Sequence, residues 1–306
     1  MADVPRDPDR PDEPDRRGDM PPHGRDEDRW DPVVSADGRT LSGFELPEYD
    51  MDRDLGDGTT SRDWLGRFTP DRANLPEVSL DEARDHIAEY ADERPWLAPA
   101  RDREPEVQRV FTALDVGQGH ALERHDGYPT EPMVERRATF LEDPAQLDEA
   151  KRERSEDAFH PGRTHRCGEY ATRIWEPDAF ATAFARGIEH PDVRRALDRP
   201  FDPDRRPPDV AIPVVDLLGP DGHRFCAGYR LEPVGGSAEA AVDCRAHWVD
   251  AQRRGQEPDA PEPKAAPIDS FEGGRIAFFF RPTRSRDGYE VATMYVEPPD
   301  QPRKGA

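Results

Sequence analysis

The chain has 306 residues, of which 36% are charged and 34% hydrophobic, with 34 prolines and a formal net charge of −23. A chain this polar lacks the apolar area to order its whole length, so we expect part of it to be disordered. The negative charge disfavours non-specific attraction to nucleic acid, although a local cationic cleft is compatible with it.

The cysteines and the first residues of the chain indicate the cellular compartment in which the protein works. Cys167, Cys226 and Cys244 are an odd number without C-x-x-C spacing, which argues against a disulfide framework. The beginning, MADVPRDPDRPDEPDRR, has no apolar run typical of a secretory signal. No stretch approaches the roughly 18 apolar residues of a membrane span. We expect a cytoplasmic protein that does not enter membranes, unless a specialised route exports it.

The first third of the chain predicts little packed structure. Residues 1–75 are rich in Pro, Asp and Arg without a hydrophobic period, which predicts a disordered acidic tail. Residues 76–103 are expected to form a helical linker, because Ser79 and Glu82 fit a capping box and Ile87 and Tyr90 recur at helical spacing. The folded domain is expected over 104–300.

Helices and then strands are expected within that domain. Helical patterns cover about 104–114, 120–124 and 130–140, and another lies within 176–197. After residue 205, short segments rich in β-branched and aromatic residues predict strands, and Asp287-Gly288 predicts a hairpin between the last two. The fold class is α+β, with N-terminal helices before a twisted antiparallel sheet and insertions at about 141–166 and 237–270.

The segment VGQGHALERHDGYPTEP, residues 116–132, contains the best candidates for chemistry. His120, Arg124 and His125 precede a glycine and two prolines that end a short helix. A histidine at a helix end has a pKa suited to proton transfer. The alternative is that these side chains are exposed and that His125 merely caps a carbonyl.

Other classes of site are disfavoured by spacing. His120 and His125 are separated by roughly 140° around a helix, unlike i,i+4 ligands. Adding His160, His165 and Cys167 gives no recognised zinc pattern. G-x-S-x-G, P-loop and G-x-G-x-x-G motifs are absent from the sequence. Among the classes of site considered, acid/base chemistry on a phosphodiester remains.

Three stretches resemble a known family. GQGHALERHDGY…MVERRATFLED, YATRIWEPDAFATAFARGI and RIAFFFRPTRSRDGYEVATMYVEPP are similar to the RNase A-like toxin domain of bacterial contact-dependent growth-inhibition proteins. The resemblance covers roughly residues 108–300. His125 matches the second histidine of G-H-x-L-x-R-H-V-G, Arg136 the arginine eleven residues later, and Thr293 and Tyr295 the final T-x-Y pair.

The resemblance implies a metal-independent, cofactor-free ribonuclease, of the toxin or effector type, in an RNase A-like fold. Its reaction is attack by the 2′-hydroxyl of RNA, and a cognate inhibitor protein is the expected partner. His125 would transfer a proton and Arg136 neutralise charge on the phosphorane. Thr293 would bind a phosphate oxygen or a base edge, and Tyr295 would position the phosphate or protonate the leaving oxygen. His120 and Arg124 would bind substrate.

The chain departs from the family pattern beside His125. Asp126 stands in place of valine, and Tyr128-Pro129 stands in place of one lysine-like residue. Asp126 would either raise the pKa of His125 or repel a phosphate. The second possibility and the net charge favour an alternative, a catalytically degenerate binding or interaction module on the same fold. A zinc-dependent hydrolase is the third hypothesis.

Overall fold

The computed structural model describes residues 33–34, 40–41, 46–117 and 119–299. The chain forms two units, Met1–Asp31 and Pro32–Ala306, and everything below concerns the second. Most of the predicted tail therefore lies outside the described residues. Strands β1 (Val33–Val34) and β2 (Thr40–Leu41) pair as a short antiparallel ribbon.

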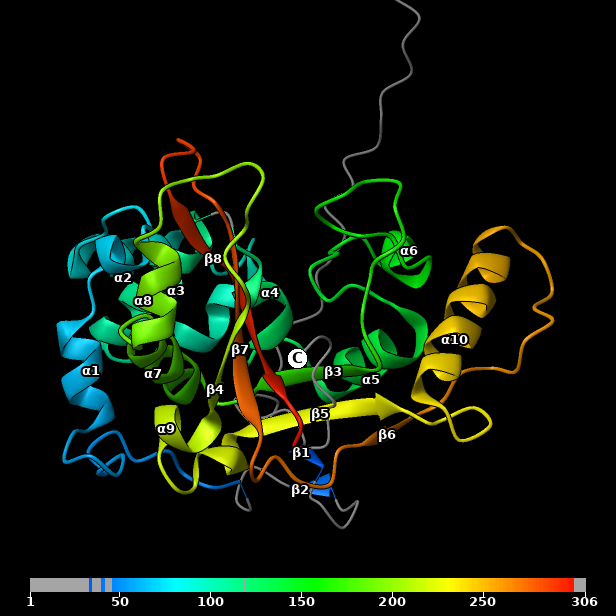
Figure 1. Ribbon diagram of the computed structural model, residues 1–306, viewed down its shortest axis with the longest axis horizontal. Helices are drawn as coiled ribbons and strands as arrows, with labels where there is room; N and C mark the ends of the chain where they lie inside the picture. Colours follow the sequence, from blue (N-terminus) through cyan, green and yellow to red (C-terminus); the bar gives the residue numbers. More distant parts are fainter. Residues whose placement is uncertain (1–32, 35–39, 42–45, 118, 300–306) are drawn as a thin grey trace, which may run out of the picture. The chain divides into compact units, whose positions relative to one another are not determined.

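Short helices make up most of the first half of the described chain (Figure 1). Two of them begin at capping boxes, Thr60 with Asp63 and Ser79 with Glu82, which satisfy the free N–H groups of the first turn. The helices are α1 (Ser61–Arg67), η2 (Pro70–Ala73), α2 (Leu80–Tyr90), η3 (Pro95–Ala100), α3 (Pro105–Val116), α4 (Ala121–His125), α5 (Glu131–Phe140) and α6 (Glu149–Glu153).

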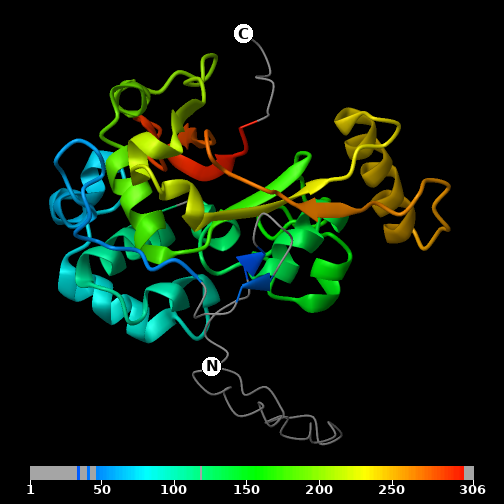
Figure 2. The same cartoon turned by 90° about the horizontal axis from the view of Figure 1, so that it is seen from below.

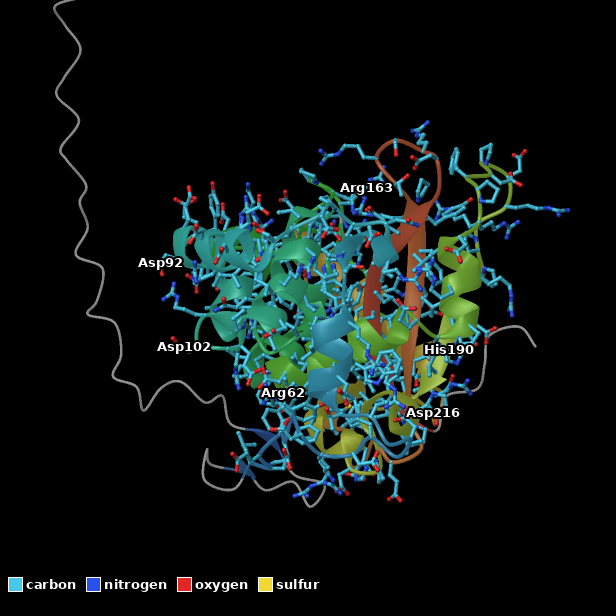
Figure 3. All side chains as sticks on the ribbon, turned by 90° about the vertical axis from the view of Figure 1, so that its left-hand side faces the viewer. Arg62, Asp92, Asp102, Arg163, His190 and Asp216 are labelled. Atoms are coloured by element: carbon cyan, nitrogen blue, oxygen red, sulfur yellow. The ribbon has the colours of Figure 1, made fainter. Side chains whose placement is uncertain are left out.

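Residues 46–103 contribute to the packed core, so the prediction of a tail reaching residue 75 is wrong. The helix predicted within 76–103 is present as α2, but it belongs to the folded domain and is not a linker before it. Leu65, Phe68, Ile87 and Leu97 are all buried in the main hydrophobic cluster. The apolar residues of this segment stand on very short helices and loops, so they follow no helical or strand period. Charged side chains such as Asp92 and those of the neighbouring helices form the outer surface (Figure 3).

Two antiparallel three-stranded sheets replace the single sheet that the sequence predicted. One has the order β3-β5-β6 and the other β4-β7-β8. Their strands are β3 (Tyr170–Ile174), β5 (Cys226–Leu231) and β6 (Ala265–Pro267), and β4 (Val210–Pro213), β7 (Arg275–Pro282) and β8 (Tyr289–Glu297). Strands β7 and β8 form the predicted hairpin. The α+β class is confirmed.

The two sheets run in different directions and meet at β3 and β8 (Figure 1). The Thr172 hydroxyl on β3 donates a hydrogen bond of 2.7 Å to the Val296 carbonyl on β8. Helices α7 (Pro177–Gly187), α8 (Pro191–Leu197) and α9 (Val214–Leu218) lie on the β4-β7-β8 side. Helix α9 lies in the part of the chain after residue 205, where the apolar segments predicted strands.

Strands β7 and β8 bury one face and leave the other open. Ile276 and Phe278 on β7, and Met294 and Val296 on β8, have at most 1% of their surface exposed. Successive side chains of a strand point to opposite faces, so the residues between them face away from this core. That opposite face forms one wall of the site described below.

The two predicted insertions are ordered parts of the fold. The second contains α10 (Ala238–Arg253) and β6, which lie far from α1 and α2 (Figure 2). Arg245 of α10 is buried and donates hydrogen bonds to the carbonyls of Ala138, Cys167 and Gly168 at 2.5, 2.6 and 2.8 Å. The hydrogen bonds of Arg245 thus connect α10 to α5 and to the loop before β3.

Candidate active site

A groove of about 1800 Å³ is lined by both sheets together with α4, α5, α8 and α10. Its charges balance, in contrast to the net charge of the whole chain. Six arginines line it (Arg124, Arg137, Arg166, Arg195, Arg199 and Arg275), as do six acids (Glu169, Asp192, Asp209, Glu239, Asp243 and Glu297). The groove is therefore less repulsive to an anion than the rest of the protein.

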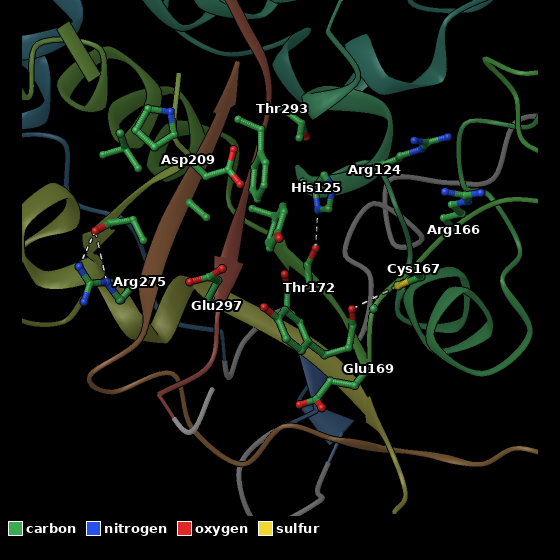
Figure 4. Close-up of a pocket in the computed structure, with 18 of the residues that line it drawn as sticks. Arg124, His125, Arg166, Cys167, Glu169, Thr172, Asp209, Arg275, Thr293 and Glu297 are labelled. Carbon is green, nitrogen blue, oxygen red and sulfur yellow. Dashed lines mark hydrogen bonds between the residues drawn. The ribbon is translucent and has the colours of Figure 1, made fainter. Parts of the chain in front are cut away.

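His125 lies on the wall of this groove with its ring in a fixed orientation. It is 5% exposed, and its Nδ1 lies 3.0 Å from the carbonyl oxygen of Thr172 (Figure 4). A carbonyl can only accept, so Nδ1 carries the proton and Nε2 carries a lone pair. Burial, and then the charge of Arg137, hold the pKa of His125 well below its ordinary value. The imidazole is neutral and able to accept a proton at Nε2.

Tyr295 stacks on His125 and links it to the sheet. The two ring centroids are 5.2 Å apart with 27° between the planes, and Phe279 stacks on Tyr295 at 5.1 Å and 15°. Burial raises the pKa of Tyr295, and the nearby Glu297 and Asp209 raise it further. The phenol therefore keeps its proton at neutral pH and can donate it in a hydrogen bond.

Thr293 presents a buried hydroxyl without a partner. It lines the groove, is 8% exposed, and its Oγ1 has no hydrogen bond to any of the described residues. Thr293 and Tyr295 are two apart on β8 and so project from the same face of the sheet. A buried hydroxyl without a partner is unfavourable, so this position favours a ligand atom that accepts or donates a hydrogen bond.

Arg136 lies outside the groove, so the prediction that it would join His125 there is wrong. Its side chain is half exposed, its Nε donates to Glu142 at 2.7 Å, and its guanidinium lies over the ring of Phe140. An arginine paired in this way has its charge compensated on the far side of α5.

Arg137 is the arginine that reaches His125. It is 6% exposed, and its three hydrogen bonds go to uncharged acceptors: the Arg124 carbonyl at 3.0 Å, His165 Nε2 at 3.2 Å and His125 Nε2 at 3.5 Å. No carboxylate of the described chain binds it, and burial lowers its pKa. A buried cation with only neutral partners favours an anion in the adjacent groove.

The geometry of α5 explains the shift by one residue. Helix α5 starts after the N-cap Thr130, and its buried face includes Val134, Arg137 and Ala138. Those residues recur at the spacing of one helix face, whereas Arg136 points elsewhere. Of the two neighbouring arginines, Arg137 therefore faces the groove.

His120 and Arg124 both line the groove, but His120 is neutral and Arg124 carries a charge that is already paired. Burial, with Arg124 and Arg137 nearby, lowers the pKa of His120 to about 3, so this imidazole is neutral. Arg124 is 7% exposed and donates to Asp143 at 2.8 Å and to Asp157 at 3.2 Å. Because its charge is already paired, Arg124 holds the groove wall, and only His120 keeps free capacity toward a substrate.

A buried network behind the groove holds Arg137 in place. His165 accepts from Arg137 at Nε2, so its Nδ1 donates to Asp157 at 3.1 Å. Burial lowers the pKa of His165 to about 4, which keeps it a hydrogen-bond acceptor for the guanidinium. Arg124, Asp143, Asp157 and His165 thus form one connected support for Arg137.

Asp143, Asp157 and His165 are also close enough together to suggest a metal site. The guanidinium of Arg124 already lies against both carboxylates. Although burial opposes it, the hydrogen bond with His165 and then the charge of Arg124 lower the pKa of Asp157. A cation would have to displace Arg124 from a buried ion pair, which is unfavourable. This cluster therefore offers the zinc hypothesis no support.

Asp126 does not face the groove. It is fully buried, its Oδ1 accepts the N–H of Tyr128 at 2.7 Å, and its Oδ2 has no partner among the described residues. Burial raises the pKa of Asp126 well above its ordinary value, so the carboxyl is neutral. It can neither repel a phosphate in the groove nor act as a charged partner of His125.

Sequence reasoning missed Arg137, His165 and both carboxylates of the network. Arg137 could have been found from its position on the apolar face of α5, counted from the N-cap. Asp143, Asp157 and His165 lie in the first predicted insertion, and no local pattern distinguishes them from the exposed acids around them.

No protein family, curated protein or solved structure matches the chain. None of the helices in the described ranges has the length and apolar character needed to cross a membrane.

Proposed function

We propose that the groove cleaves RNA without a metal ion, through attack of the 2′-hydroxyl on the adjacent phosphodiester. The observation that carries this proposal is a pair of buried groups in the groove: the cation of Arg137, whose hydrogen bonds go to uncharged acceptors, and the hydroxyl of Thr293, which has no partner among the described residues. A phosphate supplies oxygens for both, and its negative charge matches the arginine. The neutral imidazole of His125 lines the same groove, with its Nε2 3.5 Å from Arg137.

The first step of the proposed reaction needs a base. In the proposed complex, Arg137 turns from Nε2 of His125 to the phosphate. Nε2 then takes the proton of the 2′-hydroxyl, and the 2′-oxygen forms a bond to phosphorus. Arg137 stabilises the charge that develops on the phosphoryl oxygens, and the Thr293 hydroxyl donates to one of them. RNA supplies its own nucleophile, so the protein contributes proton transfer and charge stabilisation.

The second step releases the 5′-oxygen. The bond from phosphorus to this oxygen breaks, and the oxygen takes a proton from the phenol of Tyr295, which burial keeps protonated. The products are a 2′,3′-cyclic phosphate and a 5′-hydroxyl. The proton held by His125 then returns to Tyr295 through water. DNA lacks the nucleophile and is not cleaved.

The proposal is tested by incubating the purified full chain with RNA in EDTA and identifying the ends of the products. We expect cleavage with cyclic phosphate ends in wild type and a loss of at least about 10²-fold in His125→Asn. Asparagine keeps a donor toward the Thr172 carbonyl and removes the base, so folding should be preserved.

His190→Asn is the matched control. His190 is the N-cap of α8, outside the groove, where asparagine is a favoured residue. This variant should cleave RNA as wild type does. Absence of cleavage by folded wild type, loss of cleavage in EDTA, or equal rates in His125→Asn and wild type would each contradict the proposal.

A further inference from the structure

The sheet places an acid, an aromatic ring and the unsatisfied hydroxyl in one row across the groove wall. Phe279 on β7 pairs with Thr293 on β8, and Val210 at the start of β4 pairs with Phe278. Asp209 immediately precedes Val210, so it continues the same row on the other side of Phe279. All three residues of this row, Asp209, Phe279 and Thr293, line the groove. Neighbours in such a row have Cβ atoms roughly 5 Å apart.

The next row across the sheet has small side chains, except at its end on β8. Ala211, Ala277 and Tyr295 lie opposite one another on β4, β7 and β8, and they line the groove as well. Two methyl side chains leave a shallow floor between the ring of Phe279 and the strand ends. Tyr295 covers one face of the Phe279 ring, which is half-buried and turned toward the groove. Flat aromatic surface beside a shallow floor is suited to stacking with a nucleobase.

Asp209 adds a hydrogen-bond acceptor to this surface. It is exposed, and its carboxylate makes no hydrogen bond or ion pair with any of the described residues. In the close-up it points toward the side of the groove that holds Thr293 and His125 (Figure 4). A free carboxylate at this place can bind two adjacent N–H donors through its two oxygens.

We propose that Phe279 and Asp209 form a subsite for guanine, the base of the nucleotide whose 2′-hydroxyl attacks; this inference rests on the proposed function. Guanine presents a ring N–H and an amino group side by side on one edge, which matches a carboxylate. Adenine, cytosine and uracil each present only one donor group on the corresponding edge. Unpaired bases are read along this edge, so the substrate is single-stranded RNA.

The row also sets the distance between base and phosphate. Thr293 lies directly across from Phe279, and it provides the hydroxyl assigned to the phosphate. A nucleotide stacked on Phe279 thus has its own 3′-phosphate beside Thr293, with His125 stacked behind Tyr295. The subsite therefore selects the base on the 5′ side of the cleaved bond, so cleavage follows guanosine.

The test uses DNA oligonucleotides that contain one ribonucleotide, so that cleavage is possible at one bond only. With the full chain, we expect the guanosine substrate to be cleaved at least about tenfold faster than those with adenosine, cytidine or uridine. The inosine substrate, which lacks the amino donor, should fall between them. Asp209→Asn should remove the preference for guanosine, so that the four substrates are cleaved at similar rates. Asp192→Asn, a groove acid paired with Arg195, is the matched control and should keep the preference.

Binding of nucleoside 3′-monophosphates, measured by calorimetry, separates the subsite from catalysis. Guanosine 3′-monophosphate should bind wild type at least about tenfold more tightly than the other three, and Asp209→Asn should lose this difference. Equal cleavage at all four bases would overturn the subsite but leave the proposed function standing. If cleavage is absent but guanine-selective binding is retained, the proposed function is overturned and the subsite stands. Equal binding of all four nucleotides, or a preference unchanged in Asp209→Asn, overturns the subsite.

Discussion

The imidazole of His125 and the phenol ring of Tyr295 are stacked, with centroids 5.2 Å apart, although one ends the short helix α4 and the other belongs to the last strand. The contact joins the two parts of the chain that carry the family-like motifs. It also defines which neighbours can take part in chemistry, because a side chain must reach this pair to act with it.

The two adjacent arginines of α5 should behave oppositely. Arg137→Gln removes the buried cation beside His125 and should reduce RNA cleavage by about 10²–10³-fold, the effect of losing one group that stabilises the transition state. Arg136→Gln removes only a half-exposed pair with Glu142 and should leave the rate within about twofold. Cleavage rates of the two variants, with circular dichroism as a folding check, decide the assignment. Loss of activity in Arg136→Gln alone would restore the assignment made from sequence.

Thr293→Val should stabilise the fold and weaken cleavage. Valine has the shape of threonine and removes a buried hydroxyl without a partner, so the free energy of unfolding should rise by about 1 kcal/mol. Cleavage should fall about tenfold, because a donor to the phosphate is lost. Thr172→Val provides the comparison: its hydroxyl is bonded to Val296, and its loss should lower the free energy of unfolding. A destabilised Thr293→Val with normal activity would show that the hydroxyl has only a structural role.

Activity should persist in mild acid. A general base must be unprotonated, so the rate falls as pH decreases through the pKa of His125. Burial and Arg137 hold that pKa well below its ordinary value, so kcat/KM should stay level from pH 8 to below pH 6.5. Arg137→Gln removes the largest charge effect on this pKa and should move the acid limb of any residual activity upward. An acid limb at pH 6.5 or higher in wild type contradicts His125 as the base.

Asp126→Asn should change stability and not activity. The folded pKa of Asp126 is raised, so the folded protein holds a proton that the unfolded chain releases above pH 4. Wild-type stability therefore decreases as pH rises from about 4 toward that pKa, by up to about 1.4 kcal/mol per pH unit for this group. Asparagine keeps the acceptor for Tyr128 and removes the titration, so the variant gains relative to wild type as pH rises. Denaturant unfolding at pH 5 and pH 8 measures this gain, and a marked loss of cleavage would instead place Asp126 in the site.

Removing Arg124 should destabilise the protein strongly. Arg124→Leu leaves Asp143 and Asp157 as buried carboxylates without their cation, a change that typically lowers the free energy of unfolding by about 3–5 kcal/mol. Arg195→Leu breaks an exposed pair with Asp192 and should change stability by less than about 1 kcal/mol. Similar denaturation midpoints in both variants would contradict the supporting role of the network.

Local sequence patterns predicted individual helices and strands better than they predicted which of these elements pack together. The helix around Phe180 and Phe184, the Ser79 capping box and the β7-β8 hairpin were recognisable because each depends on residues close in sequence. The packing of residues 46–75 was not recognisable from the sequence, because Leu65 and Phe68 are buried by distant segments and follow no period. Nor could a local pattern show that β3 and β5 form a sheet separate from β7.

Local pattern was enough to predict that a histidine ends a short helix and that Thr293 and Tyr295 share one face of a strand, because helix ends and strand alternation are local properties of the chain. Which arginine joins them depends on how α5 packs. A helix turns by about 100° per residue, so two adjacent arginines cannot face the same way, and here Arg137 lines the groove while Arg136 is turned outward. The neutrality of His125 and Asp126 was likewise decided by the tertiary structure, because burial arises only when distant segments exclude water.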